Sequence, residues 1–488
     1  MSTGLQFSII IWIIIEWTLR IIALFVVPRN RKPSAATAWL LVIFLVPPLG
    51  WLIFAVFGYA KLPKHRRDAQ SSLDTYISQS VDMVRSHWQN GDRLVKVRTP
   101  SKYISSARLS EGLSHLSVFG GNAIEPLPHY EESIRRIVSD IDAAHSFVYV
   151  EYYILALDDT TEPLFNAMAK AIKRGVTVRV LFDAYGFRKF PRCHEMLARM
   201  AQDGVQALPM LPFQWPGKHY TRPDLRNHRK LVVIDGVVGY TGSLNMVARN
   251  YHRKDDIVYD EMTVRIEGPS VSQLGLVFLN DWYAESGEIP DDASLDAAQP
   301  LIPSGSALAQ VLPSGPGYEY DNNLKLFNNL FYTAQRTITI VNPYFVPDPS
   351  LIIALTSAAQ RGVTVTLINS EVRDQWMVAH AQRSYYEEML RAGVNIYLYK
   401  KPTLLHSKFT LIDDDACFVG SSNMDIRSLE LDQELTLIVY DKAFVGAMQA
   451  ITDGYISNSS QIDKDEWFAR PPRKQLLDNL ARLTSSVQ

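Results

Sequence analysis

The feature that most constrains this chain is a polar motif that occurs twice. The stretch NHRKLVVIDGVVGYTGSLN begins at residue 227, and LHSKFTLIDDDACFVGSSN begins at residue 405. The two copies superimpose without a gap, so the spacing is duplicated as well as the composition. The equivalent residues are His228 and His406, Lys230 and Lys408, Asp235 and Asp413, Gly242 and Gly420, Ser243 and Ser421, and Asn245 and Asn423.

Each copy predicts a buried strand with polar groups at its ends. The His and Lys of HxK alternate onto one face, and an apolar run follows at 231–234 or 409–412. A turn and a second short strand, 237–240 or 416–419, then lead to Gly-Ser. If the copies meet about a pseudo-twofold axis, their histidines, lysines and asparagines surround one anion with hydrogen-bond donors. A phosphodiester is an anion that needs such a set.

The pattern HxK(x4)D followed by GSxN, present twice, resembles the phospholipase D superfamily. A single HxK(x4)D would be explained as well by the end of a surface strand. The alternative for the pair is a structural duplication whose chemistry has decayed, but decay should have removed at least one of the shared residues.

The resemblance implies a reaction that proceeds through a covalent intermediate. Transfer of a phosphatidyl group without a metal requires a nucleophile, an acid for the leaving alkoxide and cations around the phosphoryl oxygens. His228 would attack phosphorus to form a phosphohistidine, and His406 would protonate the leaving glycerol and then deprotonate the incoming alcohol. The near-symmetric motifs leave the exchanged assignment open. The residues expected to hold the nonbridging oxygens are Lys230, Lys408, Asn245 and Asn423, with Ser243 and Ser421 as helpers.

Acidic residues complete the predicted site. Asp235 and Asp413 belong to the catalytic motif, but each follows its strand in a turn, so we expect it to cap the turn or to pair with a basic residue. Beyond GSxN, the strands EMTV and ELTL begin with Glu261 and Glu434. The resemblance implies that an acid here orients a catalytic histidine through its second ring nitrogen. Asp260 leaves a one-residue ambiguity, and a solvated strand end is the alternative for each glutamate.

No metal or cofactor is expected. The sequence shows no cluster of carboxylates at metal-binding spacing, and the resemblance implies no obligatory ion. The two cysteines, Cys193 and Cys417, are far apart, and the second occupies a small buried position within the motif. A disulfide framework is therefore not predicted.

The duplication extends over whole domains. RGVTV occurs verbatim at 174–178 and 361–365, ahead of each motif, and strands alternate with helices around it. The predicted fold is α/β, with two phospholipase D-like domains at 117–285 and 307–463 related by pseudo-twofold symmetry. The segment 286–306 is rich in Pro, Asp, Ser and Gly, which indicates a linker.

Two apolar runs near the N-terminus predict membrane helices. Residues 5–27 are long enough to cross a hydrocarbon layer of about 30 Å, and Glu16 and Arg20 share a helix face there. Residues 35–59 form a second run, interrupted by prolines, and a hairpin of two spans over 1–60 is favoured over one span plus a re-entrant loop. The first run, residues 5–27, is too long for a cleaved signal and is expected to be an anchor. The segment 31–58 resembles the N-terminal region of bacterial cardiolipin synthases.

The remaining segments are expected to meet the membrane surface. The connector 61–116 starts with basic residues, which favour anionic headgroups and a catalytic region on the cytoplasmic side of the bacterial inner membrane. The loop 208–223 either dips into the bilayer or packs on its domain. The amphipathic tail 464–488 suits an interfacial helix but could equally cap the fold.

These features predict an integral membrane enzyme that acts on lipid. The resemblance implies a cardiolipin synthase, which joins two phosphatidylglycerols into cardiolipin and releases glycerol; oligomerisation is left open. A phospholipase D, or a transphosphatidylase with another donor or acceptor, is the alternative of the same class. A membrane-tethered nuclease is disfavoured, because the net charge of −2 provides no positive field for nucleic acid. A noncatalytic lipid-binding scaffold is the third alternative.

Overall fold

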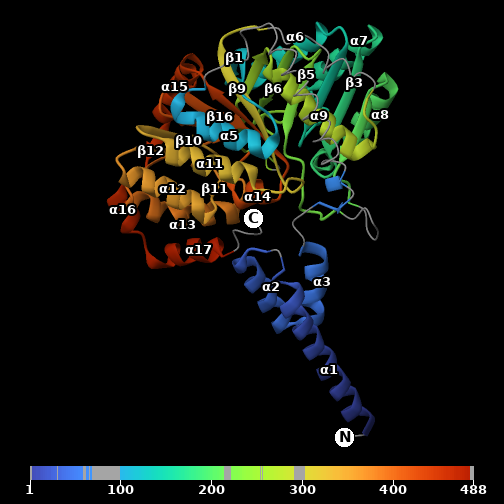
Figure 1. The fold of residues 1–488 in the computed structure, drawn as a ribbon, viewed down its shortest axis with the longest axis vertical. Helices are drawn as coiled ribbons and strands as arrows, with labels where there is room; N and C mark the ends of the chain where they lie inside the picture. Colours follow the sequence, from blue (N-terminus) through green and yellow to red (C-terminus); the bar gives the residue numbers. More distant parts are fainter. Residues whose placement is uncertain are drawn as a thin grey trace. The chain divides into compact units, whose positions relative to one another are not determined.

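The computed structural model describes residues 3–483 except 30, 59–61, 65, 69–98, 214–220, 253, 255 and 291–302 (Figure 1). The chain forms two compact units. The N-terminal unit comprises Met1–Leu62 with Arg222–Asp224, and the large unit comprises Pro63–Thr221 with Leu225–Gln488. The middle of the predicted connector, most of the predicted linker, part of the loop 208–223 and the last five residues of the predicted tail lie outside the described residues.

In the part of the chain that the structure describes, both halves of the large unit share one mixed sheet of 15 strands. In the first half the strands are β1 (Phe119–Leu127), β2 (Phe147–Tyr152), β3 (Thr177–Asp183), β4 (Gln206–Met210), β5 (Lys230–Ile234), β6 (Val238–Gly242) and β8 (Thr263–Glu267). In the second half they are β9 (Ala307–Ser314), β10 (Thr337–Val341), β12 (Thr364–Ser370), β13 (Asn395–Tyr399), β15 (Phe409–Ile412), β16 (Ala416–Gly420), β18 (Glu434–Tyr440) and β19 (Ser459–Gln461).

The two halves have the same strand order when it is read outward from the centre. The central strands β1 and β9 pair with each other in antiparallel fashion. From β1 the order is β8, β6, β5, β2, β3 and β4; from β9 it is β18, β16, β15, β10, β12 and β13, with β19 added at the edge. The α/β prediction is confirmed, and the motif strands β5 and β15 occupy equivalent positions in the middle of each half.

Helices cover both faces of the sheet. In the first half, α6 (Tyr130–Asp142), α7 (Glu162–Lys173) and α8 (Cys193–Asp203) share a hydrophobic core with alternate residues of β2. The intervening residues of β2 face α9 (Ser270–Ser286), where Tyr149 stacks on Phe278 at 4.5 Å between ring centroids. The second half repeats this with α11 (Asn322–Thr333), α12 (Pro349–Gln360) and α13 (Trp376–Arg391) in one core and α15 (Lys442–Ser457) outside it.

The end of the predicted connector packs on the second half. A 3-10 turn, η1 (Ser101–Tyr103), continues into α5 (Ile104–Ser114). Lys102 Nζ donates to Asp413 Oδ2 at 2.7 Å and to Asp415 Oδ1 at 2.9 Å. Gln310 of β9 donates to the carbonyl oxygen of Ala107 at 3.2 Å. The segment that precedes the first half in sequence is therefore part of the second half in space.

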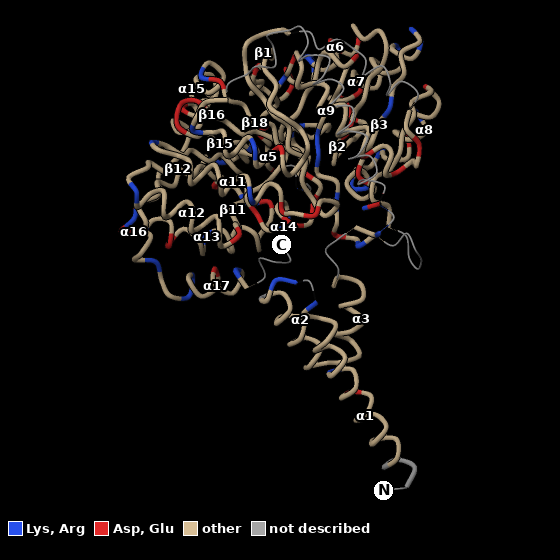
Figure 2. The backbone as a smooth tube through the Cα atoms, in the orientation of Figure 1, with Lys and Arg blue, Asp and Glu red and all other residues tan. Residues whose placement is uncertain are grey.

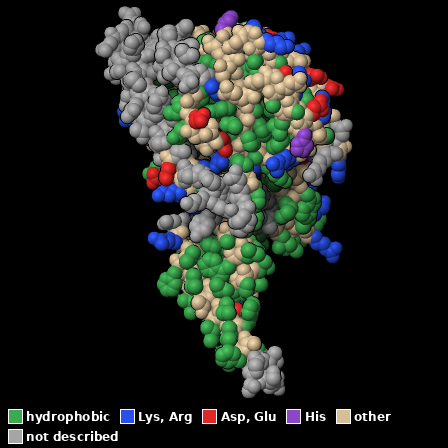
Figure 3. Space-filling model, turned by 90° about the vertical axis from the view of Figure 1, so that its right-hand side faces the viewer, with side chains coloured by type: hydrophobic (Ala, Val, Ile, Leu, Met, Phe, Trp, Pro, Cys, Tyr) green, Lys and Arg blue, Asp and Glu red, His purple; other side chains and the backbone are tan. Residues whose placement is uncertain are grey.

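Among its described residues, the N-terminal unit carries one helix suited to crossing a membrane. Within α1 (Thr3–Val26), Phe7–Val26 is long and apolar enough, by length and composition. Its surface is largely hydrophobic (Figure 3), with few charged residues (Figure 2). Glu16 and Arg20 pair at 3.0 Å, as their spacing predicted. The pair lets α1 carry two charges without leaving either one isolated.

The second apolar run forms two short helices, so the predicted second spanning helix is not confirmed. The helices are α2 (Pro33–Leu45) and α3 (Pro47–Phe57). At 1.5 Å per residue they extend about 20 and 16 Å, less than the roughly 30 Å of a hydrocarbon layer. The break falls at Val46 (φ −139°), because a residue that precedes proline is disfavoured from helical geometry.

The two short helices pack against each other in antiparallel fashion. A Cβ on Gly50 would lie 2.6 Å from Ile43 Cα, so this close approach requires glycine. Trp39 and Phe54 meet edge to face with centroids 5.4 Å apart. Within the unit, Trp51 also donates to the carbonyl oxygen of Leu19 in α1 at 3.0 Å.

Candidate active site

The two motifs meet at the junction of the halves through their backbones. His228 N donates to Gln433 O at 2.8 Å, and His406 N donates to Asp260 O at 2.7 Å. In addition, β14 (Thr403–Leu405) pairs with β7 (Val258–Asp260), so each histidine is held by the segment that leads to the acidic strand of the other half. The polar end of each motif strand therefore lies at the interface between the halves.

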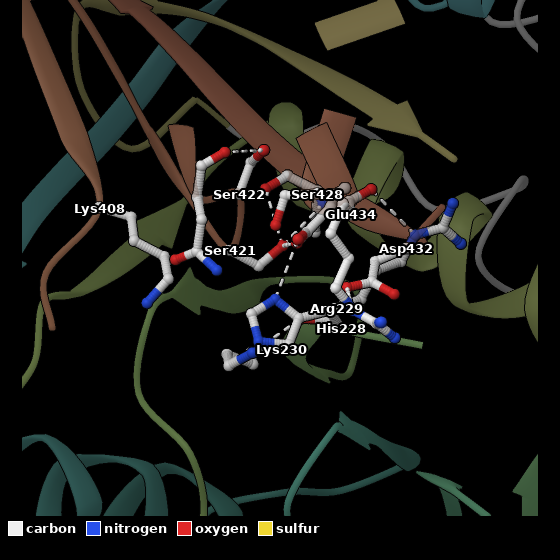
Figure 4. Close-up of polar contacts among 12 residues, drawn as sticks. His228, Arg229, Lys230, Lys408, Ser421, Ser422, Ser428, Asp432 and Glu434 are labelled. Carbon is white, nitrogen blue, oxygen red and sulfur yellow. Dashed lines mark hydrogen bonds and ion pairs between the residues drawn. The ribbon is translucent and has the colours of Figure 1, made fainter. Parts of the chain in front are cut away.

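Each motif histidine is oriented by a glutamate from the opposite half. His228 Nδ1 lies 3.0 Å from Glu434 Oε1 (Figure 4), and His406 Nδ1 lies 2.7 Å from Glu261 Oε1. Both glutamates are buried, so neither is a solvated strand end. The one-residue ambiguity resolves to Glu261, since Asp260 contributes its backbone carbonyl instead. Because the carboxylates accept hydrogen bonds from Nδ1–H, Nε2 is the ring nitrogen that can react.

The two glutamates are supported differently. The Ser421 hydroxyl donates to Glu434 Oε2 and accepts from Leu435 N at 2.9 Å. The Ser243 hydroxyl instead binds the backbone of Met262, accepting from its N at 2.9 Å. Glu261 Oε2 is buried without a hydrogen-bond partner among the described residues. Both serine hydroxyls are hydrogen-bonded to protein groups, whereas the sequence predicted that they would help to hold phosphate.

Burial tunes the two lysines of the motifs. Lys230 Nζ donates to His228 O at 2.7 Å, and Lys408 Nζ donates to His406 O at 2.8 Å and lies 3.1 Å from both ring nitrogens of His406. Burial lowers the pKa of Lys230 to about 8 and the pKa of Lys408 to about 7, although Glu434 and Glu261 oppose the shift. Lys230 also lowers the pKa of Lys408, so the two ammonium groups act within one site.

Both imidazoles favour the neutral form in the free protein. Burial lowers the pKa of His228 to about 4 against the opposing charge of Glu434. It also lowers the pKa of His406 against Glu261. The side chains remain 12% and 7% exposed, respectively. An anion placed beside Nε2 would favour the protonated form, so a bound phosphate supplies the charge that an acid role requires.

The motif aspartates lie at the far end of each strand from the histidines. Asp235 accepts backbone N–H groups that lead into β2, and Asp413 accepts those that lead into β10 as well as Lys102 Nζ. The side chains thus fasten the motif strand to its neighbour and are not at the reacting nitrogens. The donors are His145, Ser146 and Phe147 for Asp235, and Gln335, Arg336 and Thr337 for Asp413.

The motif asparagines carry unmatched polar atoms. The side-chain oxygens of Asn245 and Asn423 are buried without a hydrogen-bond partner among the described residues. Asn245 Nδ2 donates weakly to the Tyr251 hydroxyl at 3.4 Å. Buried polar groups in native proteins are normally paired, so these atoms suit a polar ligand. Their predicted role in holding phosphate stays a prediction.

Sequence reasoning missed the aromatic wall of the site. The ring of Tyr153 lies 5.1 Å from that of His228. Tyr259 and Tyr344 meet His406 edge to face, at 5.6 and 6.0 Å between centroids. The Tyr-rich strand at 146–155 was a signal for the first contact, but nothing in the sequence placed the other two beside the histidine of the second motif.

Sequence reasoning also missed the role of Arg229, the residue between His228 and Lys230. Arg229 is fully buried, pairs with Asp281 of α9, and donates through Nε to the carbonyl oxygen of Glu434 at 3.1 Å. A charged residue on a buried strand must find a buried partner, which was the available signal. The ion pair lies within the first half, and the hydrogen bond of Arg229 to Glu434 O joins the two halves.

Among the described residues, no group of three or more His, Cys, Asp or Glu is placed to hold a metal ion. The groups suited to contact a phosphate include the two imidazoles, the two ammonium groups and the side chains of Asn245 and Asn423. This arrangement can perform nucleophilic and acid–base chemistry at phosphorus from protein side chains.

Comparisons with known proteins agree with the fold. A family described as cardiolipin synthase, PLD-like domain, matches residues 137–282 and 328–455, and one described as phospholipase D-nuclease N-terminal matches residues 18–58. A solved phosphatidylserine synthase of Haemophilus influenzae Rd KW20 has a TM-score of 0.59 at 15% identity, covering 78% of this chain and 100% of that one. At this identity the likeness concerns the fold alone.

Proteins related in sequence narrow the class of protein to a family. The duplicated site on this fold defines a phospholipase D-like protein. Cardiolipin synthase A of Proteus mirabilis (strain HI4320) is 31% identical over 479 residues, 96% of each chain. Cardiolipin synthase A of Yersinia pseudotuberculosis serotype I (strain IP32953) is 32% identical over 470 residues, 94% of this chain and 93% of that protein. The chain belongs to the PLD-like cardiolipin synthase family.

Proposed function

We propose that the protein transfers a phosphatidyl group from one phosphatidylglycerol to another, giving cardiolipin and glycerol. The observation that carries this proposal is the crossed pair of histidine–glutamate contacts, His228 with Glu434 and His406 with Glu261. Two imidazoles whose Nε2 atoms are not bound by the glutamates, beside two lysines, meet the requirements of a two-step transfer at phosphorus.

In the first step the reacting phosphate lies between the halves, with its nonbridging oxygens on Lys230 and Lys408. Nε2 of His228 attacks phosphorus, a P–N bond forms and the P–O bond to glycerol breaks. His406 gives a proton to the departing oxygen. Binding of the anion raises the tendency of His406 and the lysines to carry protons, which makes this donation feasible at neutral pH.

In the second step an acceptor alcohol resolves the intermediate. His406 takes the proton from the acceptor hydroxyl, the oxygen attacks phosphorus, and the P–N bond to His228 breaks. The acceptor therefore decides the product: phosphatidylglycerol gives cardiolipin, and water gives phosphatidic acid. Glu434 and Glu261 keep each imidazole in the tautomer that presents Nε2.

We infer that the halves are related by pseudo-twofold symmetry as two phospholipase D-like domains. The shared strand order and the reciprocal glutamates support this. The domain limits 117–285 and 307–463, with the linker 286–306 between them, follow from the same comparison. Separately expressed halves should be inactive alone, because each lacks the glutamate for its own histidine, and activity should return when they are mixed.

We propose that α1 crosses the bacterial inner membrane and that α2 and α3 form a re-entrant hairpin. The short lengths of α2 and α3 and their antiparallel packing support this over a second span. The basic residues at 29–32 and 61–67 then lie on one side with the catalytic region, which favours a cytoplasmic orientation. Cysteine introduced at Arg29 should resist periplasmic thiol reagents, whereas a second span would place residues 29–32 in the periplasm and expose it to them.

We infer that the C-terminal segment serves both suggested roles. In α17 (Pro472–Arg482), Asp478 and Ala481 are buried, with the helix packed against α13. Leu476 and Leu480 are exposed on the same helix, beside basic residues that suit an anionic lipid surface. Replacing both leucines with Ser should weaken binding to phosphatidylglycerol vesicles without unfolding the protein.

The direct test supplies the purified protein with phosphatidylglycerol alone. Cardiolipin and glycerol should appear in equal amounts, and His228→Ala should form neither. Phosphatidic acid as the main product would indicate a phospholipase D, and a requirement for phosphatidylethanolamine would indicate another donor. Cleavage of plasmid DNA would support the nuclease alternative. Function that survives both histidine substitutions would support a scaffold.

A further inference from the structure

A pocket of about 150 Å³ lies in the second half, next to His406. Tyr344 forms part of its wall, and the same ring meets the imidazole of His406 at 6.0 Å between centroids. Ser370, also in the wall, accepts a hydrogen bond at 2.7 Å from the backbone N of Leu405, the residue before His406. The pocket is thus separated from the reacting phosphate by little more than one aromatic ring.

Two guanidinium groups line this pocket. Arg373 lies three residues before the start of α13, and Arg383 lies within α13. Among the residues that the structure describes, Arg373 makes no hydrogen bond or ion pair, and Nε of Arg383 is buried without a hydrogen-bond partner, 3.7 Å from Asp478 Oδ2. Burial and the adjacent charge of Arg383 lower the pKa of Arg373. Two cations brought together in this way are stabilised by an anion between them.

The carboxylates near the arginines are directed to other groups. Asp374 and Glu371 belong to the pocket wall, and Asp478 lies behind Arg383. Their partners are the Tyr344 hydroxyl for Asp374 (2.6 Å), Lys401 for Glu371 (3.7 Å), and His380 (2.7 Å), Arg470 (3.0 Å) and Arg383 (3.7 Å) for Asp478. Arg373 is therefore left for a ligand.

The proposed reaction brings a second phosphate close to His406. The acceptor phosphatidylglycerol presents a hydroxyl to the phosphohistidine, and its own phosphate follows on the same glycerol. The lysines of the motifs are occupied by the phosphate being transferred, so the acceptor phosphate requires other cations. Arginine suits this task, because its planar fork binds phosphate oxygens in bidentate fashion.

We propose that Arg373 and Arg383 bind the phosphate of the acceptor lipid and so select a phosphorylated alcohol over water. The assignment rests on the proposed function and adds to it the residues that choose the acceptor. A lipid source is favoured over free phosphate, because Trp376 and Met377, 59% and 42% exposed, follow the pocket wall at the start of α13 and suit contact with acyl chains.

The test compares two soluble acceptors that differ only by a phosphate. Purified protein in phosphatidylglycerol micelles receives labelled glycerol or labelled glycerophosphate, the headgroup of the acceptor itself, and the labelled lipids are counted. The wild type should prefer glycerophosphate at equal concentration. Arg373→Gln and Arg383→Gln should each reduce that preference at least tenfold, and cardiolipin formation with it, while glycerol exchange changes less than twofold. Arg373→Lys, which keeps the charge, should retain part of the preference.

Arg391→Gln is the matched control, since Arg391 lies at the other end of α13 and is exposed with Glu387 as its partner. An unchanged preference, or a parallel loss with both acceptors, would overturn the pocket assignment. The assignment would also be overturned if inorganic phosphate inhibited glycerol exchange in the wild type but not in the variants, because the pocket would then be a site for free phosphate. A wild type that forms no cardiolipin would instead overturn the proposed function, and the acceptor assignment with it.

Discussion

The two halves of the large unit share a strand order but give their histidines unequal surroundings. Glu434, which orients His228, has both oxygens engaged, one by the imidazole and one by Ser421. Glu261, which orients His406, has one oxygen without a partner among the described residues. His406 additionally has Lys408 at 3.1 Å from both ring nitrogens, whereas the hydrogen bond that Lys230 makes among the described residues goes to the backbone carbonyl of His228.

This difference indicates that duplication of a backbone does not duplicate a chemical role. A fully supported carboxylate fixes His228 in one tautomer, and burial keeps its ring neutral, as a nucleophile requires. A histidine beside an ammonium group and a less constrained carboxylate can change its protonation state more easily, as an acid and base must. The unequal support therefore favours His228 as the nucleophile, in agreement with the order that the resemblance implied.

Replacing the histidines tests this inequality most severely. His228→Ala and His406→Ala should each lower kcat by about 10³-fold or more, because general acid–base and nucleophilic contributions are of this size. The two variants should differ in whether the covalent intermediate accumulates. Labelled phosphatidylglycerol should leave a covalent adduct on His406→Ala and none on His228→Ala. The opposite pattern would reverse the assignment of the histidines.

Replacing the glutamates sharpens the comparison. Glu434→Gln and Glu261→Gln should lower kcat by about 10- to 100-fold, the usual loss when a group that orients a histidine is removed. Ser421→Ala should also lower kcat, by about tenfold, since hydrogen bonds to charged groups contribute about 1.5–3 kcal/mol. Ser243→Ala is the matched control, because its hydroxyl binds the backbone of Met262 and not a glutamate. Equal losses in the two serine variants would contradict the unequal support.

The pH dependence separates the two lysines. Each must be protonated to hold phosphate, so kcat/KM should fall as pH rises through the pKa of Lys408, about 7, and again through that of Lys230, about 8. Lys408→Arg should remove the first decrease and leave the second, because arginine stays charged. Lys230→Arg should do the reverse. A profile identical to that of the wild type in both variants would exclude lysine titration as its cause.

The aspartate pair should show the smallest effect on activity. Asp235→Asn and Asp413→Asn should lower the free energy of unfolding by about 1–3 kcal/mol, because buried amides lose charged acceptors, while the folded protein stays active. Asp413→Asn should be the more costly, since Lys102 also loses its partner. Thermal unfolding in detergent measures both.

Acid should abolish the difference between the wild type and Asp413→Asn. Burial opposes ionisation, but Lys102 and three backbone amides lower the pKa of Asp413 below its usual value. Its contribution is present above the unfolded pKa of about 4 and is lost as pH falls through the lowered folded pKa. A stability difference that persists in strong acid would point to packing and not to charge.

Local sequence patterns predicted much of the architecture. The duplicated motif, the RGVTV repeats and the 2.0- and 3.6-residue periodicities predicted the α/β class, the motif strands and the helix α1, because each depends on neighbouring residues. The break in the second apolar run was visible as Pro47 and Pro48. Its consequence was not, because whether a kinked run spans or folds back depends on the packing of Gly50 against Ile43.

The sequence by itself determined which residue types form the site: two histidines, two lysines and two glutamates on a repeated scaffold. Only the tertiary structure decided that each glutamate serves the histidine of the other half, that the serines support protein groups, and that two arginines far along the chain line a pocket beside His406. The reason is physical. Strand and helix preferences act over a few residues, whereas these contacts depend on how two independently patterned halves dock along β1 and β9.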